Sequence, residues 1–465
     1  MVNDISNQQF PLPEDVLKLK HAGDFSGALR KIAYLLERDR TPEPLRRRLE
    51  LEQHVIEALC DDQYPYSIDE AQQIMKDGLA DYREDELERY RECGAADWIF
   101  IDGHVRFNRR FFANLASTRP ELETRLLVRT NVEESIRDKA LRDEQVRLMA
   151  LHGGRTARIT VHLGLRVKKP FERPGVPVLV HLPLPRECRQ ISEIHILAHG
   201  PGEMTIAPAD ALQRTIAFSK NLQCEQEFWV EFSYVNHVDY LVLDPAVAAE
   251  AATCRPAEGA HSEYLVEQAP HIVFTPYLRA LAAEIVGDET NPLVKARRIY
   301  DFITTNVMYS YVRRYDTIDD LSEYAAVNLK GDCGIQALLF ITLCRICGIP
   351  ARWQSGLYVT PEEIGCHDWA EFFIAPYGWL FCDCSFGGGA WRGGKTDRWN
   401  HYFGNLDVLR LPASGAIQTP FDPPKRHWRG DPIDNQRGEM EYEDAGLSHS
   451  QIDFLHRTIS FEWMD

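Results

Sequence analysis

The sequence lacks long hydrophobic runs, low-complexity tracts and internal repeats. Because no stretch holds 18 consecutive apolar residues, neither a membrane-spanning helix nor a membrane partner is expected. Residues 1–10 also lack the basic start and the apolar run of a secretory signal. Together these absences predict a cytoplasmic protein.

Basic residues are scarce relative to acidic ones. The chain carries 52 lysines and arginines against 70 aspartates and glutamates, a net charge of −18, so nucleic acid is not an expected partner. The 11 cysteines are odd in number and scattered, which fits a reducing compartment, where a reactive thiol stays usable. A chain of 465 residues is long enough for two or three domains.

The spacing of hydrophobic residues divides the chain. In residues 1–150, apolar residues recur three and four positions apart, which predicts a helical domain. From Thr156 the period changes to two, and residues 151–250 are expected to form a β-sandwich. A third domain is expected at 270–411, followed by a C-terminal extension, 412–465, that packs on the core.

One stretch, residues 328–386, holds the residue types of a thiol catalytic centre. Cys333 precedes the run Ile335–Ile346, which is apolar nearly all round and predicts a buried helix that ends at Gly348 and Pro350. The unpaired N–H groups and positive dipole end of a helix N-terminus favour a thiolate and can hold an oxyanion. Cys333 is therefore the candidate nucleophile.

His367 and Asp383 are the candidate base and the group that orients it. His367 opens a β-forming segment, Ala375–Gly378 is a turn signal, and Trp379–Phe386 is the expected returning strand. The two residues then lie on neighbouring strands of one hairpin, slightly out of register. We expect a bulge or a diagonal contact between them.

This order of residues resembles the transglutaminase-like superfamily within the papain-like thiol enzymes. The resemblance spans residues 290–405 and implies an α+β fold: a papain-like transglutaminase core preceded by a β-sandwich and an N-terminal helical domain. Two departures exist, because Asp368 stands where a small residue is common and Cys384 where proline is common. The matching motifs are Gly331-x-Cys333, Gly348-Ile-Pro-Ala-Arg352, His367-x-Trp369-x-Glu371 and Gly378-Trp379 before Asp383.

The resemblance also implies a side chain that completes the oxyanion hole from a segment ahead of the nucleophile. Tyr311 and Tyr309, in a segment expected to be extended, are the candidates, although each can equally be a packed tyrosine.

The paired cysteines leave a zinc site open as an alternative. Cys344 and Cys347 are spaced C-x-x-C, and Cys382 and Cys384 are spaced C-x-C. The first pair lies inside the apolar helix and the second points away from Asp383, so we interpret all four as buried small hydrophobic residues. No metal is expected.

Glycines follow Asp383 at Gly387–Gly389 and Gly393–Gly394. They lack the strand-to-helix context of a nucleotide-binding loop, so they predict a mobile loop beside the site, and no cofactor is expected. In the C-terminal extension, the pattern predicts strands at 438–442 and 458–463 and a short helix at 448–456.

The predicted chemistry is acyl transfer from an amide through a thioester on Cys333, with His367 as base and Asp383 fixing its tautomer. The resemblance favours hydrolysis of a peptide or related amide, the action of a peptidase or amidase. Two alternatives stay open. One is a cross-linking transglutaminase, in which a lysine amine accepts the acyl group, and the other is a non-catalytic module that binds a peptide.

Overall fold

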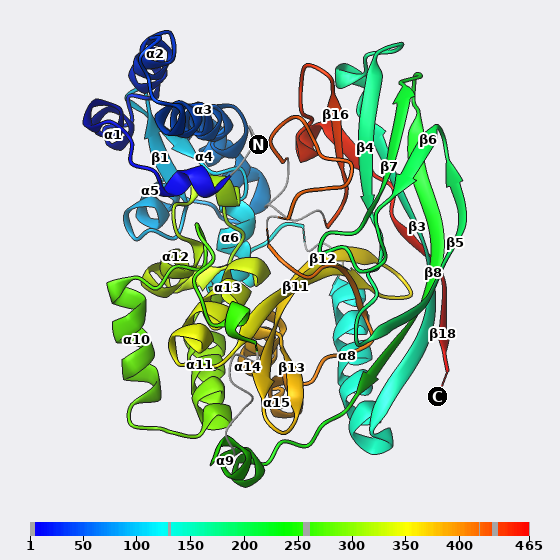
Figure 1. The fold of residues 1–465 in the computed structure, drawn as a ribbon. Helices are drawn as coiled ribbons and strands as arrows, with labels where there is room; N and C mark the ends of the chain where they lie inside the picture. Colours follow the sequence, from blue (N-terminus) through cyan, green and yellow to red (C-terminus); the bar gives the residue numbers. More distant parts are fainter. Residues whose placement is uncertain (1–4, 129–131, 254–260, 418, 430–435, 465) are drawn as a thin grey trace.

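The computed structural model describes residues 5–128, 132–253, 261–417, 419–429 and 436–464. Short helices and one small hairpin form the N-terminal part of the chain (Figure 1). Their apolar faces pack into two clusters, one under the first three helices and one around the hairpin. The elements are α1 (Glu14–His21), α2 (Phe25–Leu36), α3 (Glu43–Ala58), α4 (Ile68–Gly78), α5 (Asp85–Glu92), β1 (Trp98–Ile101), β2 (His104–Phe107), α6 (Phe111–Thr118) and α7 (Pro120–Glu123).

The helical pattern between α1 and α2 is broken at Gly23. Gly23 has a φ of +73°, and a side chain there would collide with the backbone of Phe100 in β1. Asp24 then begins α2, because its carboxylate accepts a hydrogen bond from the Gly27 backbone N–H at 2.8 Å. Gly23 and Asp24 are thus local stop and start signals that separate the two helices, and Gly23 also allows the close approach of β1.

Two antiparallel sheets form the β-sandwich, after the long helix α8 (Val132–His152). One has the order β16-β4-β7-β6 and the other β17-β3-β8-β5, with β18 also paired to β3. Alternate side chains of β3, from Ile159 to Leu165, are fully buried between the sheets. The strands are β3 (Gly154–Val167), β4 (Pro177–Pro183), β5 (Ile191–Gly200), β6 (Glu203–Ile206), β7 (Thr215–Asn221) and β8 (Glu227–Asp239).

The last residues of the chain return to this sandwich (Figure 1). They supply β16 (Glu439–Tyr442), β17 (Ile452–Phe454) and β18 (Arg457–Trp463). The helix expected at 448–456 is wrong: only His449–Gln451 form a 3₁₀ turn. The residues after that turn pair with β3 instead, because the ladder satisfies their backbone groups.

The remaining part of the chain surrounds a five-stranded antiparallel sheet of order β14-β13-β12-β11-β15. Helix α13 packs against β11 and β12, and α8 lies on the side of the sandwich (Figure 1). The strands of this sheet are β11 (Ala351–Val359), β12 (Ile364–Ile374), β13 (Gly378–Cys382), β14 (Phe403–Gly404) and β15 (Arg410–Ser414), and a separate parallel pair is formed by β9 (Met308–Tyr309) and β10 (Lys330–Gly331). The helices are α9 (Pro245–Thr253), α10 (Pro276–Val286), α11 (Pro292–Asn306), α12 (Leu321–Asn328), α13 (Cys333–Ile346), α14 (Cys384–Arg392) and α15 (Thr396–His401).

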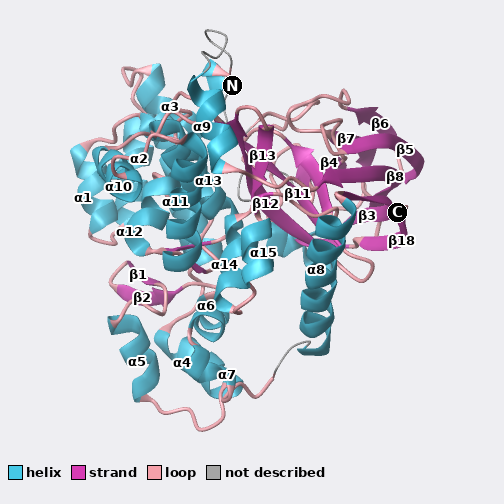
Figure 2. Ribbon diagram, turned by 90° about the horizontal axis from the view of Figure 1, so that it is seen from below, coloured by secondary structure: helices cyan, strands magenta, loops and turns pink. Residues whose placement is uncertain are grey.

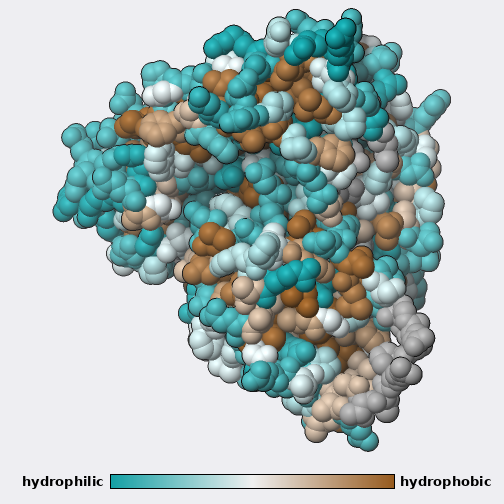
Figure 3. Space-filling model, turned by 60° about the vertical axis from the view of Figure 1, so that its left-hand side comes forward, coloured by the Kyte–Doolittle hydropathy of each residue, from teal (hydrophilic) through white to brown (hydrophobic). Residues whose placement is uncertain are grey.

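Helices and strands are largely segregated, with the sandwich on one side and most helices on the other (Figure 2). Segregated helices and antiparallel sheets make an α+β fold, as the sequence predicts. Figure 3 shows one face of the molecule, which is mainly hydrophilic with separate hydrophobic patches. In the part of the chain that the structure describes, no helix is both long and apolar enough to cross a membrane.

The glycine-rich segment after Asp383 is a helix, not the mobile loop that the sequence predicts. Residues 384–392 form α14, which packs against α11. At Gly387, any side chain would overlap the hydroxyl of Tyr300 in α11, whereas Gly389 has open space around it. The close approach of the two helices offsets the low helix propensity of glycine.

These two glycines give a matched pair of stability measurements. Gly387→Ala should lower the free energy of unfolding by about 1–3 kcal/mol, because the new methyl group displaces the buried Tyr300 ring. Gly389→Ala, in the same helix, should raise it by about 0.5–1 kcal/mol through helix propensity alone. Urea unfolding of both variants tests this. Equal effects of the two substitutions would contradict the packing described for α14.

Candidate active site

Cys333 is the first residue of α13, and the helix behind it is enclosed. Residues 334–345 are buried, as the apolar run predicts. Asp332 caps the helix by accepting a hydrogen bond from the Ile335 backbone N–H at 3.1 Å, and the Tyr315 hydroxyl donates to the same carboxylate at 2.6 Å. The packing of α13 therefore fixes the position of the thiol.

His367 and Asp383 form a buried pair. The Nε2 atom of His367 lies 2.7 Å from Oδ2 of Asp383, and both side chains are almost fully shielded from solvent. Strand β13 ends at Cys382, so the strand expected to reach Phe386 is shorter than predicted. Asp383 instead caps α14, where it accepts from the Phe386 backbone N–H at 3.0 Å. Because Ala370 is the residue opposite Cys382, the His367–Asp383 contact is diagonal, as expected.

Two cationic or hydrogen-bonding partners keep Asp383 ionised. Burial alone would raise the pKa of Asp383, but His367 and Arg410 reverse this and hold it below its ordinary value of 3.8. The guanidinium of Arg410 donates to the same Oδ2 atom at 2.9 Å and is itself fully buried. The pKa of His367 is lowered by burial, and Asp383 only partly offsets this. At neutral pH the imidazole is therefore neutral and able to accept a proton.

The Cys333 thiol is held by Asp368. Its Sγ donates to Oδ2 of Asp368 at 3.2 Å, and the Asp368 carboxylate also accepts from the side-chain amide of Gln436. The pKa of Cys333 is raised well above its ordinary value, first by burial and then by the Asp368 and Asp332 carboxylates. The thiolate that the helix dipole predicts is thus not the form that this environment favours, because burial and two carboxylates outweigh the dipole.

The structure brings His367 and Asp383 together but does not join Cys333 to them. Within the described residues, the thiol forms no hydrogen bond to His367, and the Nδ1 atom of that imidazole forms none at all. Adjacent side chains of a strand point to opposite faces, so His367 is turned away from the carboxylate that holds the thiol. A thiol–imidazole contact requires Cys333 to leave Asp368.

Residues 279–384 match the family model of the transglutaminase-like superfamily. The chain contains a transglutaminase-like domain. Cys333, His367 and Asp383 all lie inside the matched range. The matched range holds α13 and three strands of the five-stranded sheet, β11, β12 and β13.

Known proteins resemble the chain more distantly. An uncharacterized protein of Haemophilus influenzae is 28% identical over 144 residues, which cover 26% of this chain and only 39% of that protein. A candidate cysteine protease of Cytophaga hutchinsonii has 15% identity and a TM-score of 0.44, covering 67% of this chain and 91% of that one. The periplasmic domain of TgpA from Pseudomonas aeruginosa has 13% identity and a TM-score of 0.27, covering 55% and 95%. Both TM-scores are low, so neither structure bears on individual residues here.

The two candidate oxyanion tyrosines occupy different places in the transglutaminase-like domain. Tyr309 pairs with Gly331 through the short strands β9 and β10, two residues before Cys333. Its pKa is raised well above the ordinary value by burial and then by the nearby Cys333 and Asp332. Tyr311 is instead tied to α6, where Asn114 bonds its backbone and the Arg110 guanidinium covers its ring at 4.7 Å. Tyr309 is therefore the candidate nearer the thiol.

Residues that sequence reasoning missed flank the predicted site. Arg437 donates to the Cys366 sulfur at 2.8 Å, and Gln436 binds Asp368, so a C-terminal segment contacts both neighbours of His367. The role of Asp368 could have been suspected from the sequence, because an aspartate stands there in place of the small residue common in the family. The role of Arg410 could have been suspected too, because Asp407 and Arg410 are two opposite charges in the otherwise apolar segment 406–411, and buried charges are expected to be paired.

Three of the four paired cysteines are buried as predicted, whereas Cys347 at the end of α13 is only half-buried. Cys344 is buried in α13, and the sulfurs of Cys382 and Cys384 are 3.7 Å apart on either side of Asp383. Among the described residues, no group of three or more His, Cys, Asp or Glu side chains is arranged to hold a metal ion.

Removing the Asp368 carboxylate should release the thiol. In Asp368→Asn the pKa of Cys333 should fall by about one unit or more, because a negative charge beside the sulfur is lost, so alkylation by iodoacetamide at pH 7 should be about tenfold faster. Peptide mass spectrometry would measure the rate at Cys333 alone, apart from the other cysteines. Asp319→Asn removes an exposed carboxylate and serves as the control. An unchanged pKa in Asp368→Asn would show that Asp368 does not restrain the thiol.

Removing Arg410 should lower the stability of the protein and change how that stability depends on pH. Arg410→Met should lower the free energy of unfolding at pH 7 by about 3–5 kcal/mol, because the buried carboxylates of Asp383 and Asp407 both lose a partner. The stabilisation from Asp383 is present above the pKa of the unfolded chain, 3.8, and is lost as the pH falls through the lower folded pKa. The variant should therefore lose stability less steeply below pH 4.

Urea unfolding between pH 7 and pH 3 would measure both effects in Arg410→Met. The double variant Arg410→Met/Asp383→Asn should lose less stability than the sum of the two single variants, since one of the two carboxylates that Arg410 balances is replaced by a neutral amide. Strict additivity would mean that the two side chains do not interact.

Proposed function

We propose that the transglutaminase-like domain hydrolyses a peptide or a related amide through a thioester on Cys333. The observation that carries the proposal is the buried His367–Asp383 contact of 2.7 Å, which uses Nε2 and leaves Nδ1 for a thiol. This is the arrangement in which a carboxylate fixes the tautomer of a general base.

The reaction begins when the Cys333 thiol leaves Asp368 and gives its proton to Nδ1 of His367. The sulfur attacks the amide carbon, and the backbone N–H groups at the start of α13, with the Tyr309 hydroxyl, stabilise the oxyanion. The C–N bond breaks, the amine takes the proton from His367, and a thioester remains. Water, deprotonated by His367, then attacks the thioester, which releases a carboxylic acid and restores the thiol.

The nature of the acceptor separates this proposal from a cross-linking transglutaminase. If a lysine amine takes the place of water, the product is an isopeptide and no acid is released. Mass analysis of the products from a glutamine-containing peptide, with and without an added amine, distinguishes the two.

A non-catalytic peptide-binding module is the second candidate, and one observation favours it. The thiol is bonded to a carboxylate, has a raised pKa and makes no hydrogen bond to His367 within the described residues. Such a protein would bind peptides equally well with and without Cys333 and would turn none over.

Turnover of an amide library should depend on Cys333 and His367. Cys333→Ala should reduce turnover to background, and His367→Asn should lower it by at least about a hundredfold, since the general base is lost. Cys347→Ala changes a thiol at the other end of the same helix and should retain full activity. Undiminished turnover by Cys333→Ala would exclude the thioester mechanism, and peptide binding without turnover in the unmodified protein would favour the binding module.

A further inference from the structure

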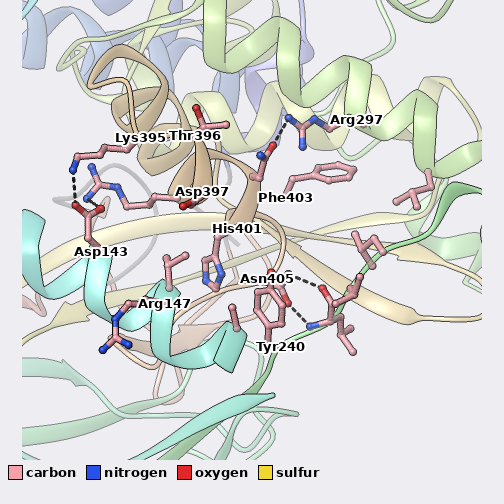
Figure 4. A pocket seen from close by; sticks show the side chains of 18 of the residues that line it. Asp143, Arg147, Tyr240, Arg297, Lys395, Thr396, Asp397, His401, Phe403 and Asn405 are labelled. Atoms are coloured by element: carbon pink, nitrogen blue, oxygen red, sulfur yellow. Dashed lines mark hydrogen bonds and ion pairs between the residues drawn. The ribbon is translucent and has the colours of Figure 1, made fainter. Parts of the chain in front are cut away.

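A cavity of about 1030 Å³ lies apart from the predicted catalytic residues. It is enclosed by α8, the segment 240–245 after β8, the start of α11, and the region from 394 to 405 that contains α15 and β14 (Figure 4). Neither Cys333, His367 nor Asp383 lines it. Its volume is at the upper end of the range of small-molecule sites.

The side chains that line the cavity carry an excess of positive charge, whereas the whole chain carries an excess of negative charge. Acidic residues outnumber basic ones in the sequence, 70 to 52. The cavity is lined instead by four cationic side chains, Arg147, Arg297, Lys395 and Arg398, and by two anionic ones, Asp143 and Asp397. This local excess of positive charge favours an anionic occupant.

The cations differ in how far they are neutralised. Arg398 and Lys395 share one carboxylate, that of Asp143, at 2.9 Å and 3.1 Å respectively. Arg297 is paired with Asp301. Arg147 is exposed at the cavity and has no hydrogen-bond or ion-pair partner among the residues that the structure describes. Its guanidinium is thus available to a ligand.

Buried polar atoms at the cavity also lack partners. His401 is only 2% exposed, and neither of its ring nitrogens has a partner at full hydrogen-bond geometry in the described part of the chain, although the nearby Leu406 backbone raises its pKa against the effect of burial. The Nε atom of Arg398 is also buried and also forms no hydrogen bond within the described residues. A buried polar group without a partner lowers the stability of the folded protein, and a hydrogen bond to a ligand or a water molecule would remove that cost.

The imidazole of His401 is held in a defined orientation. Its ring stacks on that of Tyr240, with the centroids 5.9 Å apart and the planes at 15°, and Figure 4 shows it beside Arg147 and Tyr240. Burial lowers the pKa of His401 to about 4, so the ring is neutral at pH 7 and offers one donor and one acceptor. Next to Tyr240, the side chain of Val242 is 79% exposed at the cavity and presents an apolar surface.

We propose that this cavity binds a small organic anion. Its carboxylate or phosphate group lies at Arg147 and takes a hydrogen bond from His401, and its apolar or aromatic part lies against Tyr240 and Val242. Guanidinium groups bind both carboxylates and phosphates in a bidentate manner, so the shared chemistry is an oxyanion on an apolar body. This binding does not depend on the thiol chemistry of Cys333.

Three probes with the same aromatic body separate the possibilities. Benzoate carries a carboxylate, phenyl phosphate carries a phosphate, and benzamide is neutral. Isothermal titration of the full-length protein should show saturable binding of at least one of the two anions, and weaker binding of benzamide by about tenfold or more. The anion that binds more tightly identifies the head group. Binding of all three probes with equal affinity, or of none, would overturn the proposal.

Arg147→Ala should weaken binding of the preferred anion by about tenfold or more, since a charge-assisted hydrogen bond is lost. Arg137→Ala removes the same side chain from the same helix, outside this cavity, and should leave the affinity unchanged. Equal affinities of the two variants would overturn the assignment of Arg147.

His401→Phe keeps the stacked ring on Tyr240 and removes both unpartnered nitrogens. It should weaken anion binding and at the same time raise the thermal unfolding temperature, because an unsatisfied polar group leaves the core. A purely structural histidine would raise the unfolding temperature without any change in affinity, and that result would overturn its role in binding.

Discussion

The buried carboxylate of Asp383 accepts hydrogen bonds from three separate elements, and the geometry around it depends on all three. His367 reaches it from β12, Arg410 from β15, and the Phe386 backbone N–H from α14. A carboxylate without solvent is stable only when each such donor is present, so the elements that carry them are fixed relative to one another. The orientation of the His367 imidazole follows from this constraint.

The thiol of Cys333 is under a different constraint. Helix α13 is enclosed by its neighbours, which sets the place of Cys333, and burial together with the Asp368 and Asp332 carboxylates raises the pKa of its thiol. The His367–Asp383 pair is thus formed in the same structure in which Asp368 holds the thiol.

Local patterns in the sequence predict the elements that carry the site. The apolar run after Cys333 predicts α13, alternation predicts β3, and the turn at 375–378 predicts the hairpin of β12 and β13. Contacts between distant segments are what local patterns miss. Helix α14 forms on glycines because Tyr300 lies against it, and the thiol meets Asp368 because of how a strand and a helix dock. The pairing of Arg410 with Asp383 is of the same kind.

The order in which the sandwich is assembled follows from its strands. Its first strand, β3, pairs with β17 and β18 at the end of the chain, and β4 pairs with β16. The transglutaminase-like domain lies between these segments in the sequence. The ribosome releases the N-terminal part of the chain first. Strands β3 and β4 therefore stay unpaired on one side until the intervening transglutaminase-like domain and the strands after it have been translated. A nascent chain that stalls before residue 439 therefore presents two unpaired edges to chaperones and proteases.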